Sequence, residues 1–235
     1  INHNPDHTFP NGIPNPLLVE NRPATANAVI SEGADLGVAF DGDFDRCFFF
    51  DETGAFIGGE YVLSLLATSF LDKNPGSNII HDPRVIWNVQ DIVTSKGGKA
   101  IQSKTGHAFI KQAMRQTEAI YGGEMSAHHY FRDFYYCDSG MIPWLIVCGI
   151  LSRQDLKLED FARNRQRIFP SSGELNFQVK SGDSVLRAIE DRYSTTALKV
   201  EYLDGISFLF ENIGTIDEGK ETISKKPSVT DAEGA

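Results

Sequence analysis

The spacing of apolar positions predicts alternating strands and helices along most of the chain. Short, nearly continuous apolar runs are typical of buried strands, and longer runs with apolar positions on one face are typical of helices. The pattern predicts strands at 36–40, 47–50, 78–80, 99–102 and 119–121, and helices at 24–31, 61–71, 85–95, 108–116, 139–151 and 158–168. Strands that alternate with helices imply a parallel sheet with right-handed crossovers, so the predicted fold class is α/β.

Two changes in composition divide the rest of the chain. The turn-rich sequence Phe169-Pro170-Ser171-Ser172-Gly173 marks a boundary. Beyond it the pattern predicts a small α+β domain with strands at 175–179, 198–202 and 206–210 and a helix at 185–193. Residues 213–235 contain no aromatic residue and are rich in small and charged residues, so we expect them to be disordered.

Charge and cysteine content narrow the classes of protein. The chain has 235 residues, with 22 Lys and Arg against 32 Asp and Glu, a net charge of −10. This acidity argues against a nucleic-acid-binding protein. The longest apolar run, 141–151, is far shorter than the roughly 20 residues of a membrane span. Three cysteines without a Cys-x-x-Cys pair argue against a disulfide framework, and a reducing, cytoplasmic location is expected.

An acidic loop is predicted between the first two strands. Its sequence, Asp41-Gly42-Asp43-Phe44-Asp45-Arg46, places carboxylates at alternate positions, where they converge on one cation if the loop curls. Three such oxygens leave room for water or a phosphate oxygen, which suits Mg²⁺, and the Arg46 guanidinium suits phosphate. A solvated acidic turn explains an isolated motif of this kind equally well.

Two other functions share this acidic pattern. A calcium loop of the EF-hand type requires glycine where Arg46 stands and helices on both sides, so it is set aside. A phosphatase of the haloacid dehalogenase type, with Asp41 as its nucleophile, remains an alternative.

Polar segments follow the next three predicted strands, at 81–84, 104–107 and 122–129. Each is a weak signal alone, because an isolated Arg or His after a strand is commonly a surface or capping residue. Together they occupy the carboxyl edge of one parallel sheet, where open α/β sheets bind ligands. The residues gathered there would be Arg84, Lys104, His107, Glu124, Ser126 and His128.

The chemistry of these side chains suits a phosphosugar. Cations and a histidine suit a phosphate and proton transfer, whereas a carboxylate and a hydroxyl suit paired sugar hydroxyls. We therefore expect a phosphosugar site that faces the acidic loop.

Three motifs in fixed order carry a family resemblance. The segment 41–46, the Lys-Thr-Gly-His at 104–107 and the Gly-Glu-Met-Ser-Ala-His at 123–128 resemble the α-D-phosphohexomutases, most closely the bacterial phosphomannomutases, over residues 11–212. The resemblance implies a four-domain enzyme with parallel-sheet α/β domains. Residues 1–55 would end its second domain, 56–168 would form the third, and 169–212 would be an incomplete α+β fourth domain.

The resemblance also implies a reaction. In this family a phosphoserine on the first domain phosphorylates a sugar monophosphate, and the 1,6-bisphosphate intermediate then returns its other phosphate to the serine. Mg²⁺ would be the cofactor, and hexose 1,6-bisphosphate the activator. The implied reaction interconverts mannose 6-phosphate and mannose 1-phosphate, which feeds GDP-mannose and surface polysaccharide synthesis.

Each motif residue takes a role from the family pattern. The metal ligands would be Asp41, Asp43 and Asp45. The catalytic residues would be Arg46, Arg84 and His107. The sugar-binding residues would be Gly106, Glu124, Ser126 and His128.

Two family features are absent from the sequence. No serine lies in the Thr-Ala-Ser-His-Asn-Pro context of the phosphoserine, and Ile213-Gly214-Thr215 replaces the phosphate-binding loop of the fourth domain. The chain also begins at Ile1 without a methionine. We expect a fragment that lacks the first domain and is inactive alone. A non-catalytic fragment that binds sugar phosphate weakly is the other alternative.

Overall fold

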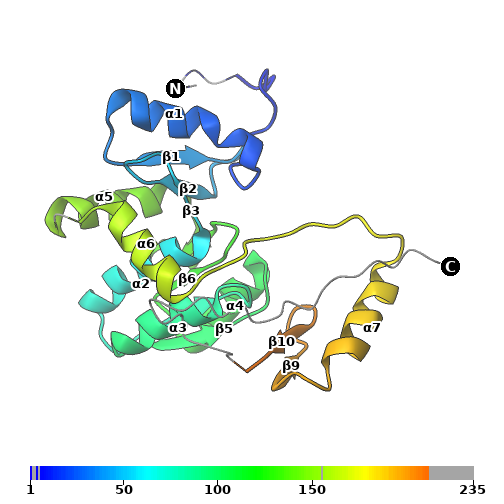
Figure 1. Ribbon diagram of the computed structural model, residues 1–235. Coiled ribbons are helices and arrows are strands. Elements are labelled where there is room, and N and C mark those ends of the chain that lie inside the picture. The colour runs from blue at the N-terminus through cyan, green and yellow to red at the C-terminus, as the bar shows by residue number, and fades with distance from the viewer. Residues whose placement is uncertain (2–3, 5, 155, 212–235) are drawn as a thin grey trace, which may run out of the picture. The chain divides into compact units, whose positions relative to one another are not determined.

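The computed structural model describes residues 1, 4, 6–154 and 156–211, and the chain forms two compact units (Figure 1). The first unit comprises residues 1–176 and the second residues 177–235. The tail predicted to be disordered, 213–235, lies outside the described residues.

The first unit opens with a helix on a small antiparallel sheet. Helix α1 (Pro23–Glu32) follows the short 3-10 helix η1 (Val19–Asn21), begins at a proline and ends at Gly33 in the left-handed conformation. It packs on β1 (Gly37–Phe40), which pairs with β2 (Cys47–Phe50), and β2 pairs with β3 (Phe56–Ile57). The pairing of Phe40 with Cys47 brings the two ends of segment 41–46 together. The helix and both predicted strands are confirmed.

A five-stranded sheet forms the larger part of this unit. Its order is β5-β4-β6-β7-β8, with β4 (Asn78–His81) parallel to both β5 (Lys99–Gln102) and β6 (Tyr121–Gly123). These three strands were predicted, and their shared carboxyl edge is confirmed.

The strands beyond β6 correct the prediction that β6 leads directly into a helix. Antiparallel strands β7 (His129–Phe131) and β8 (Cys137–Asp138) come first, with the 3-10 helix η2 (Arg132–Phe134) between them. Each strand is short, and the turn before β8 places Tyr135 and Tyr136 at φ values of 55° and 62°. Tyrosine is not a usual turn residue at positive φ, so the turn leaves no sequence signal.

Besides α1, five further α-helices are described in this unit. They are α2 (Gly59–Lys73), α3 (Ile86–Ser95), α4 (His107–Thr117), α5 (Met141–Gln154) and α6 (Leu158–Ile168). Helix α2 is buried on nearly all sides, as its apolar composition predicted, and forms the centre of the core with α3 and α5. Within the described part of the chain, no helix combines the length and apolarity needed to cross a membrane.

The described part of the second unit contains one helix and a hairpin. Helix α7 (Gly182–Tyr193) and antiparallel strands β9 (Lys199–Glu201) and β10 (Ser207–Leu209) match the predicted elements. The predicted strand 175–179 is wrong, because no described strand pairs with it. Its alternating apolar residues, Leu175, Phe177 and Val179, are at least half exposed.

Candidate functional site

The loop between β1 and β2 gathers three carboxylates. Asp41 is buried, Asp43 is exposed and Asp45 is half-buried, and one oxygen from each lies within 4.8 Å of the others. Phe44 adopts a φ of 63°, the left-handed conformation that reverses the chain within the loop. Alternate side chains therefore converge, as the sequence predicted, and they offer the oxygen donors that a hard cation prefers.

Arg46 fixes the position of Asp41. Its backbone N–H donates to Asp41 Oδ1 at 3.2 Å, and its Nε donates to Oδ2 at 2.7 Å. Burial raises the pKa of Asp41, but these hydrogen bonds and the charge of Arg46 act with Asp43 to outweigh burial and leave the pKa below its usual value. Asp41 is thus held as a carboxylate, and each oxygen keeps a lone pair for a further ligand.

The environment of the Asp45 carboxylate indicates whether a cation fits between the three aspartates. Its Oδ1 is buried and has no hydrogen-bond partner; Arg46 Nε is 3.7 Å away, beyond hydrogen-bond length. Burial raises the pKa of Asp45, and the charges of Asp41 and Asp43 raise it further, whereas His128 opposes the rise. An unpartnered carboxylate oxygen beside two other carboxylates fits a divalent cation such as Mg²⁺.

Replacing Asp43 with asparagine should weaken Mg²⁺ binding by about tenfold or more, because a neutral amide replaces one of three anionic ligands. Calorimetric titration of the wild type and the variant measures this difference. Equal affinity would remove Asp43 from the metal site.

A tight turn after β6 carries the predicted sugar-binding residues. The Ala127 N–H donates to the Glu124 carbonyl, and the Glu124 N–H donates to the His128 carbonyl. Ala127 adopts a φ of 69° to close this turn. Ser126 and His128 lie together, with 3.0 Å between Ser126 Oγ and His128 Nδ1.

Glu124 is almost fully buried and joins this turn to its neighbours. Its Oε1 accepts the Gly106 N–H at 2.7 Å, and its Oε2 accepts the Tyr130 hydroxyl at 2.6 Å. The segment 104–107 is therefore anchored to the turn at 124–128. The carboxylate serves the internal architecture of the site, whatever ligand it also meets.

Asp82 links Arg84 to the same turn. Its carboxylate is fully buried and accepts the Arg84 backbone N–H at 2.8 Å and the Arg84 Nη2 at 2.6 Å. It also accepts the Met125 N–H at 3.0 Å. The remaining guanidinium nitrogen, Nη1, lies 3.5 Å from Glu174. Asp82 thus holds Arg84 at the rim, a role that no sequence motif predicted.

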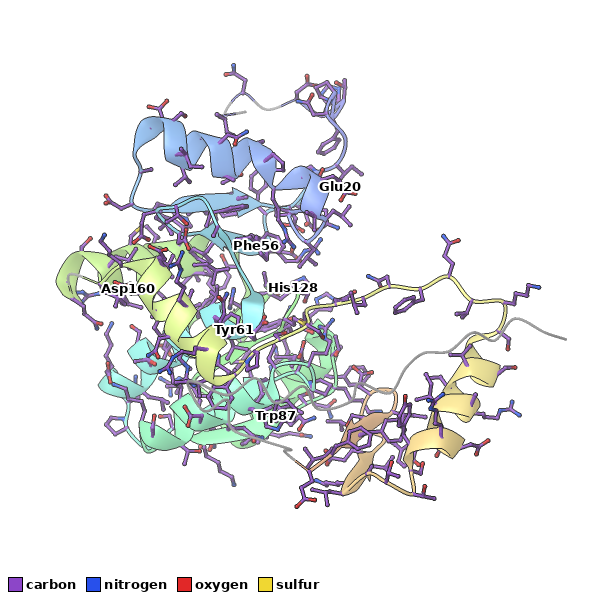
Figure 2. The ribbon with its side chains drawn as sticks, viewed as in Figure 1. Glu20, Phe56, Tyr61, Trp87, His128 and Asp160 are labelled. Atoms are coloured by element: carbon purple, nitrogen blue, oxygen red, sulfur yellow. The ribbon has the colours of Figure 1, made fainter. Side chains whose placement is uncertain are left out.

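The acidic loop and the turn at 124–128 contact each other directly. Arg46 and His128 form an isolated antiparallel bridge, and the Cys47 N–H donates to the Ala127 carbonyl. His128 Nε2 lies 3.3 Å from Asp45 Oδ2, and its Nδ1 lies 3.5 Å from Glu124 Oε2. Figure 2 shows His128 where the two sheets of this unit adjoin. One imidazole therefore spans the predicted metal and sugar residues.

Two predicted residues lie farther out on the rim. His107 begins α4 and is largely exposed, with its Nδ1 4.0 Å from Asp138 Oδ2. Lys104 is exposed, and its ammonium lies 5.6 Å from the centre of the Phe109 ring. Asp138 Oδ1 also forms an ion pair with Lys111 Nζ, at 2.8 Å.

Sequence reasoning missed three residues of this network, which are Asp82, Tyr130 and Asp138. Asp82 stands in the recognised segment 81–84, and its position two residues before Arg84 was the available signal. Tyr130 and Asp138 belong to β7 and β8, the strands that the apolar pattern did not reveal.

The structure gives no support to Asp41 as a phosphatase nucleophile. Asp41 directly follows the apolar strand β1, as that alternative expected, but β1 belongs to a small antiparallel sheet and not to the parallel strands of the larger one. Both oxygens of Asp41 also accept hydrogen bonds from Arg46, which lowers their availability for attack.

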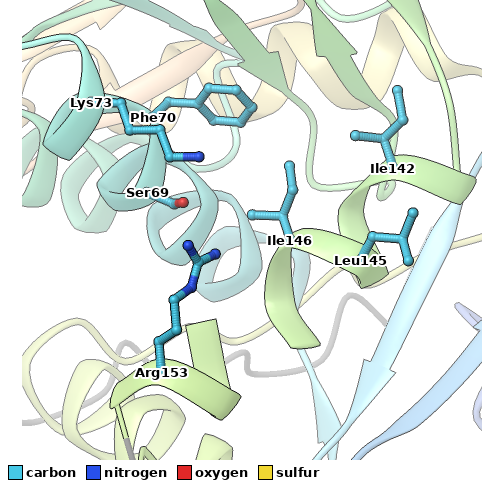
Figure 3. Close-up of a pocket in the computed structure, with 7 residues that line it drawn as sticks. All are labelled: Ser69, Phe70, Lys73, Ile142, Leu145, Ile146 and Arg153. Atoms are coloured by element: carbon cyan, nitrogen blue, oxygen red, sulfur yellow. The ribbon is translucent and has the colours of Figure 1, made fainter. Parts of the chain in front are cut away.

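A separate hollow of about 220 Å³ lies between α2 and α5, away from these loops (Figure 3). Its lining residues are Ser69, Phe70, Lys73, Ile142, Leu145, Ile146 and Arg153. None of them is a predicted site residue.

Models of one protein family match two stretches of the chain. The model of the alpha/beta/alpha domain III of phosphoglucomutase/phosphomannomutase matches residues 58–168, and the model of domain II matches residues 1–54.

Curated relatives are similar over most of the chain. A phosphomannomutase of Escherichia coli K12 is 58% identical over 210 residues, which is 89% of this chain and 46% of that protein. A phosphomannomutase of Vibrio cholerae is 55% identical over 212 residues, 90% of this chain and 46% of that protein. The chain thus spans about half the length of the curated relatives it matches.

Solved structures share the fold. A phosphoglucomutase/phosphomannomutase family protein of Burkholderia thailandensis superposes with a TM-score of 0.70 at 30% identity, over 87% of this chain and 44% of that one. This likeness confirms the predicted α/β fold class of the phosphohexomutase type.

Proposed function

The chain belongs to the phosphoglucomutase/phosphomannomutase family, and we propose that it supplies the metal loop and the sugar-binding turn of an enzyme that interconverts mannose 6-phosphate and mannose 1-phosphate. The reaction would run through a phosphoserine and a 1,6-bisphosphate, with hexose 1,6-bisphosphate as activator. Its product would feed GDP-mannose and polysaccharide synthesis in the cytoplasm.

One observation carries this proposal: the acidic loop and the turn at 124–128 contact each other directly. The bridge between Arg46 and His128 joins them, and His128 contacts Asp45 on one side and Glu124 on the other. A phosphosugar needs both halves, because its phosphate must meet the charged loop while its hydroxyls meet the turn.

The chain's own residues would divide the work as follows. A divalent cation on Asp41, Asp43 and Asp45 would lower the negative charge of a reacting phosphate. Arg46 would orient Asp41 and face the phosphate, and Arg84, held by Asp82, would add a second guanidinium. Such positioned charges supply much of the catalysis in phosphoryl transfer.

Two histidines would handle protons. His128 lies against Asp45 and Ser126, and His107 is exposed on the rim near Asp138. Histidine suits this task because its usual pKa lies close to neutral pH. Buried His129 is different, since burial lowers its pKa to about 3 and keeps it neutral.

The names of the curated relatives favour mannose over glucose as the sugar.

In a full-length enzyme that carries this sequence, Glu124→Gln should weaken binding of mannose phosphates by at least about 1 kcal/mol, because a charged hydrogen bond becomes neutral. Steady-state kinetics with mannose and glucose 1-phosphates measure the loss.

The matched control is Tyr130→Phe, which removes one internal hydrogen bond of Glu124 and leaves its carboxylate in place. It should change the KM less than Glu124→Gln does. Unchanged KM and kcat in Glu124→Gln would show that Glu124 is only structural and would oppose the proposed sugar site.

A further inference from the structure

Asp45, His128 and Asp138 form a second cluster of metal-binding donors. One ligand atom of each lies within 4.8 Å of the other two. They come from the acidic loop, from the turn after β6 and from β8. The cluster shares Asp45 with the three-carboxylate site, but it adds an imidazole nitrogen, which Mg²⁺ sites rarely use and Zn²⁺ sites commonly do.

The ring of His128 is oriented as in a metal-ligating histidine. Its Nδ1 faces two oxygens, Ser126 Oγ at 3.0 Å and Glu124 Oε2 at 3.5 Å. With a metal ion at Nε2, the proton of the neutral ring would lie on Nδ1, where these two oxygens can accept it. Histidines that bind metals characteristically give their other ring N–H to such an oxygen.

The separation of the donors fits a tetrahedral ion. His128 Nε2 and Asp45 Oδ2 are 3.3 Å apart. Two ligands at the usual Zn–N and Zn–O lengths stand roughly 3.3–3.5 Å apart in tetrahedral geometry. The pair therefore has the spacing of two ligands of one ion without any movement.

Asp138 completes the set and keeps an oxygen available. Lys111 holds Oδ1 at 2.8 Å, and His107 Nδ1 lies 4.0 Å from Oδ2. Burial raises the pKa of Asp138, but the hydrogen bond and charge of Lys111, together with a backbone hydrogen bond and the charge of His128, outweigh burial and lower it. Lys111 therefore orients this ligand in the manner of an outer-shell partner.

We propose that Asp45, His128 and Asp138 bind a divalent transition-metal ion of the Zn²⁺ class, at a site distinct in donor chemistry from the three aspartates. This metal site depends only on the geometry of these three side chains, and it is independent of whether the chain takes part in a mutase reaction.

Reciprocal asparagine variants of the chain test the proposal. Co²⁺, titrated as a coloured substitute for Zn²⁺, should give the strong visible absorption of a four-coordinate site. Asp138→Asn should weaken this binding at least about tenfold, whereas the matched variant Asp43→Asn should change it less than about twofold. His128→Gln, which removes the nitrogen ligand, should abolish the absorption.

Mg²⁺ titration should give the opposite order, with loss in Asp43→Asn and none in Asp138→Asn. Thermal melting without metal verifies that each variant is folded. Unchanged Co²⁺ affinity in both Asp138→Asn and His128→Gln would overturn the proposal. Equal losses of Co²⁺ affinity in Asp43→Asn and Asp138→Asn would overturn it as well, because they would indicate a single site.

Discussion

Replacing Asp82 with alanine should lower the free energy of unfolding by about 3 kcal/mol. The side chain is fully buried and accepts hydrogen bonds from Arg84 and from the Met125 N–H. Its removal leaves two backbone donors without their partner and releases the arginine, and each buried donor left unsatisfied costs roughly 1–3 kcal/mol. Urea denaturation of wild type and variant measures the loss.

A surface pair provides the control for Asp82. Asp72 forms a 2.8 Å ion pair with Lys96, but both side chains are about 40% exposed or more. Asp72→Ala should therefore cost less than about 1 kcal/mol. If Asp82→Ala costs no more than Asp72→Ala, then Asp82 does not hold the two loops together.

The 235-residue chain alone should show no mutase turnover, even with Mg²⁺ and hexose 1,6-bisphosphate supplied. The proposed reaction is a covalent relay, which requires a nucleophile that holds phosphate between two half-reactions. None of the 235 residues is a serine in the family's phosphoserine motif. The described loops can position a phosphate and lower its charge, but they have no group to receive it.

A coupled assay on the purified chain measures this turnover. The control is the same preparation carried through a purification that removes host mutase. Turnover that persists after that step would contradict the covalent relay. Phosphate released to water and lost in Asp41→Ala would instead favour the phosphatase alternative.

The helices and strands predicted correctly from the sequence are mostly those whose apolar runs are long or fully buried. Segments 47–50 and 61–71 are apolar nearly throughout, and the structure buries them in the core. Strands β7 and β8 were missed because they are short and their pairing is set by neighbours in space. The segment 175–179 had an alternating pattern but no partner strand, so its local preference did not produce a strand.

The candidate site was predictable to the extent that it lies in motifs. The carboxyl edge of β4, β5 and β6 brought 81–84, 104–107 and 122–129 together, as parallel topology requires. What holds these segments in place was not predictable, because Asp82 and Asp138 act through contacts with residues distant in sequence. Buried polar partners of this kind become evident only when the packing is known.

In the proposed function, the acidic loop and the turn at 124–128 form one phosphosugar site. Amide NMR spectra of the chain, titrated with mannose 1-phosphate in the presence of Mg²⁺, test it most directly. We expect shifts that concentrate in residues 41–46, 104–107 and 124–128 and that weaken when Mg²⁺ is omitted. Shifts confined to other parts of the chain, or loops that do not respond while Mg²⁺ still binds, would contradict the claim.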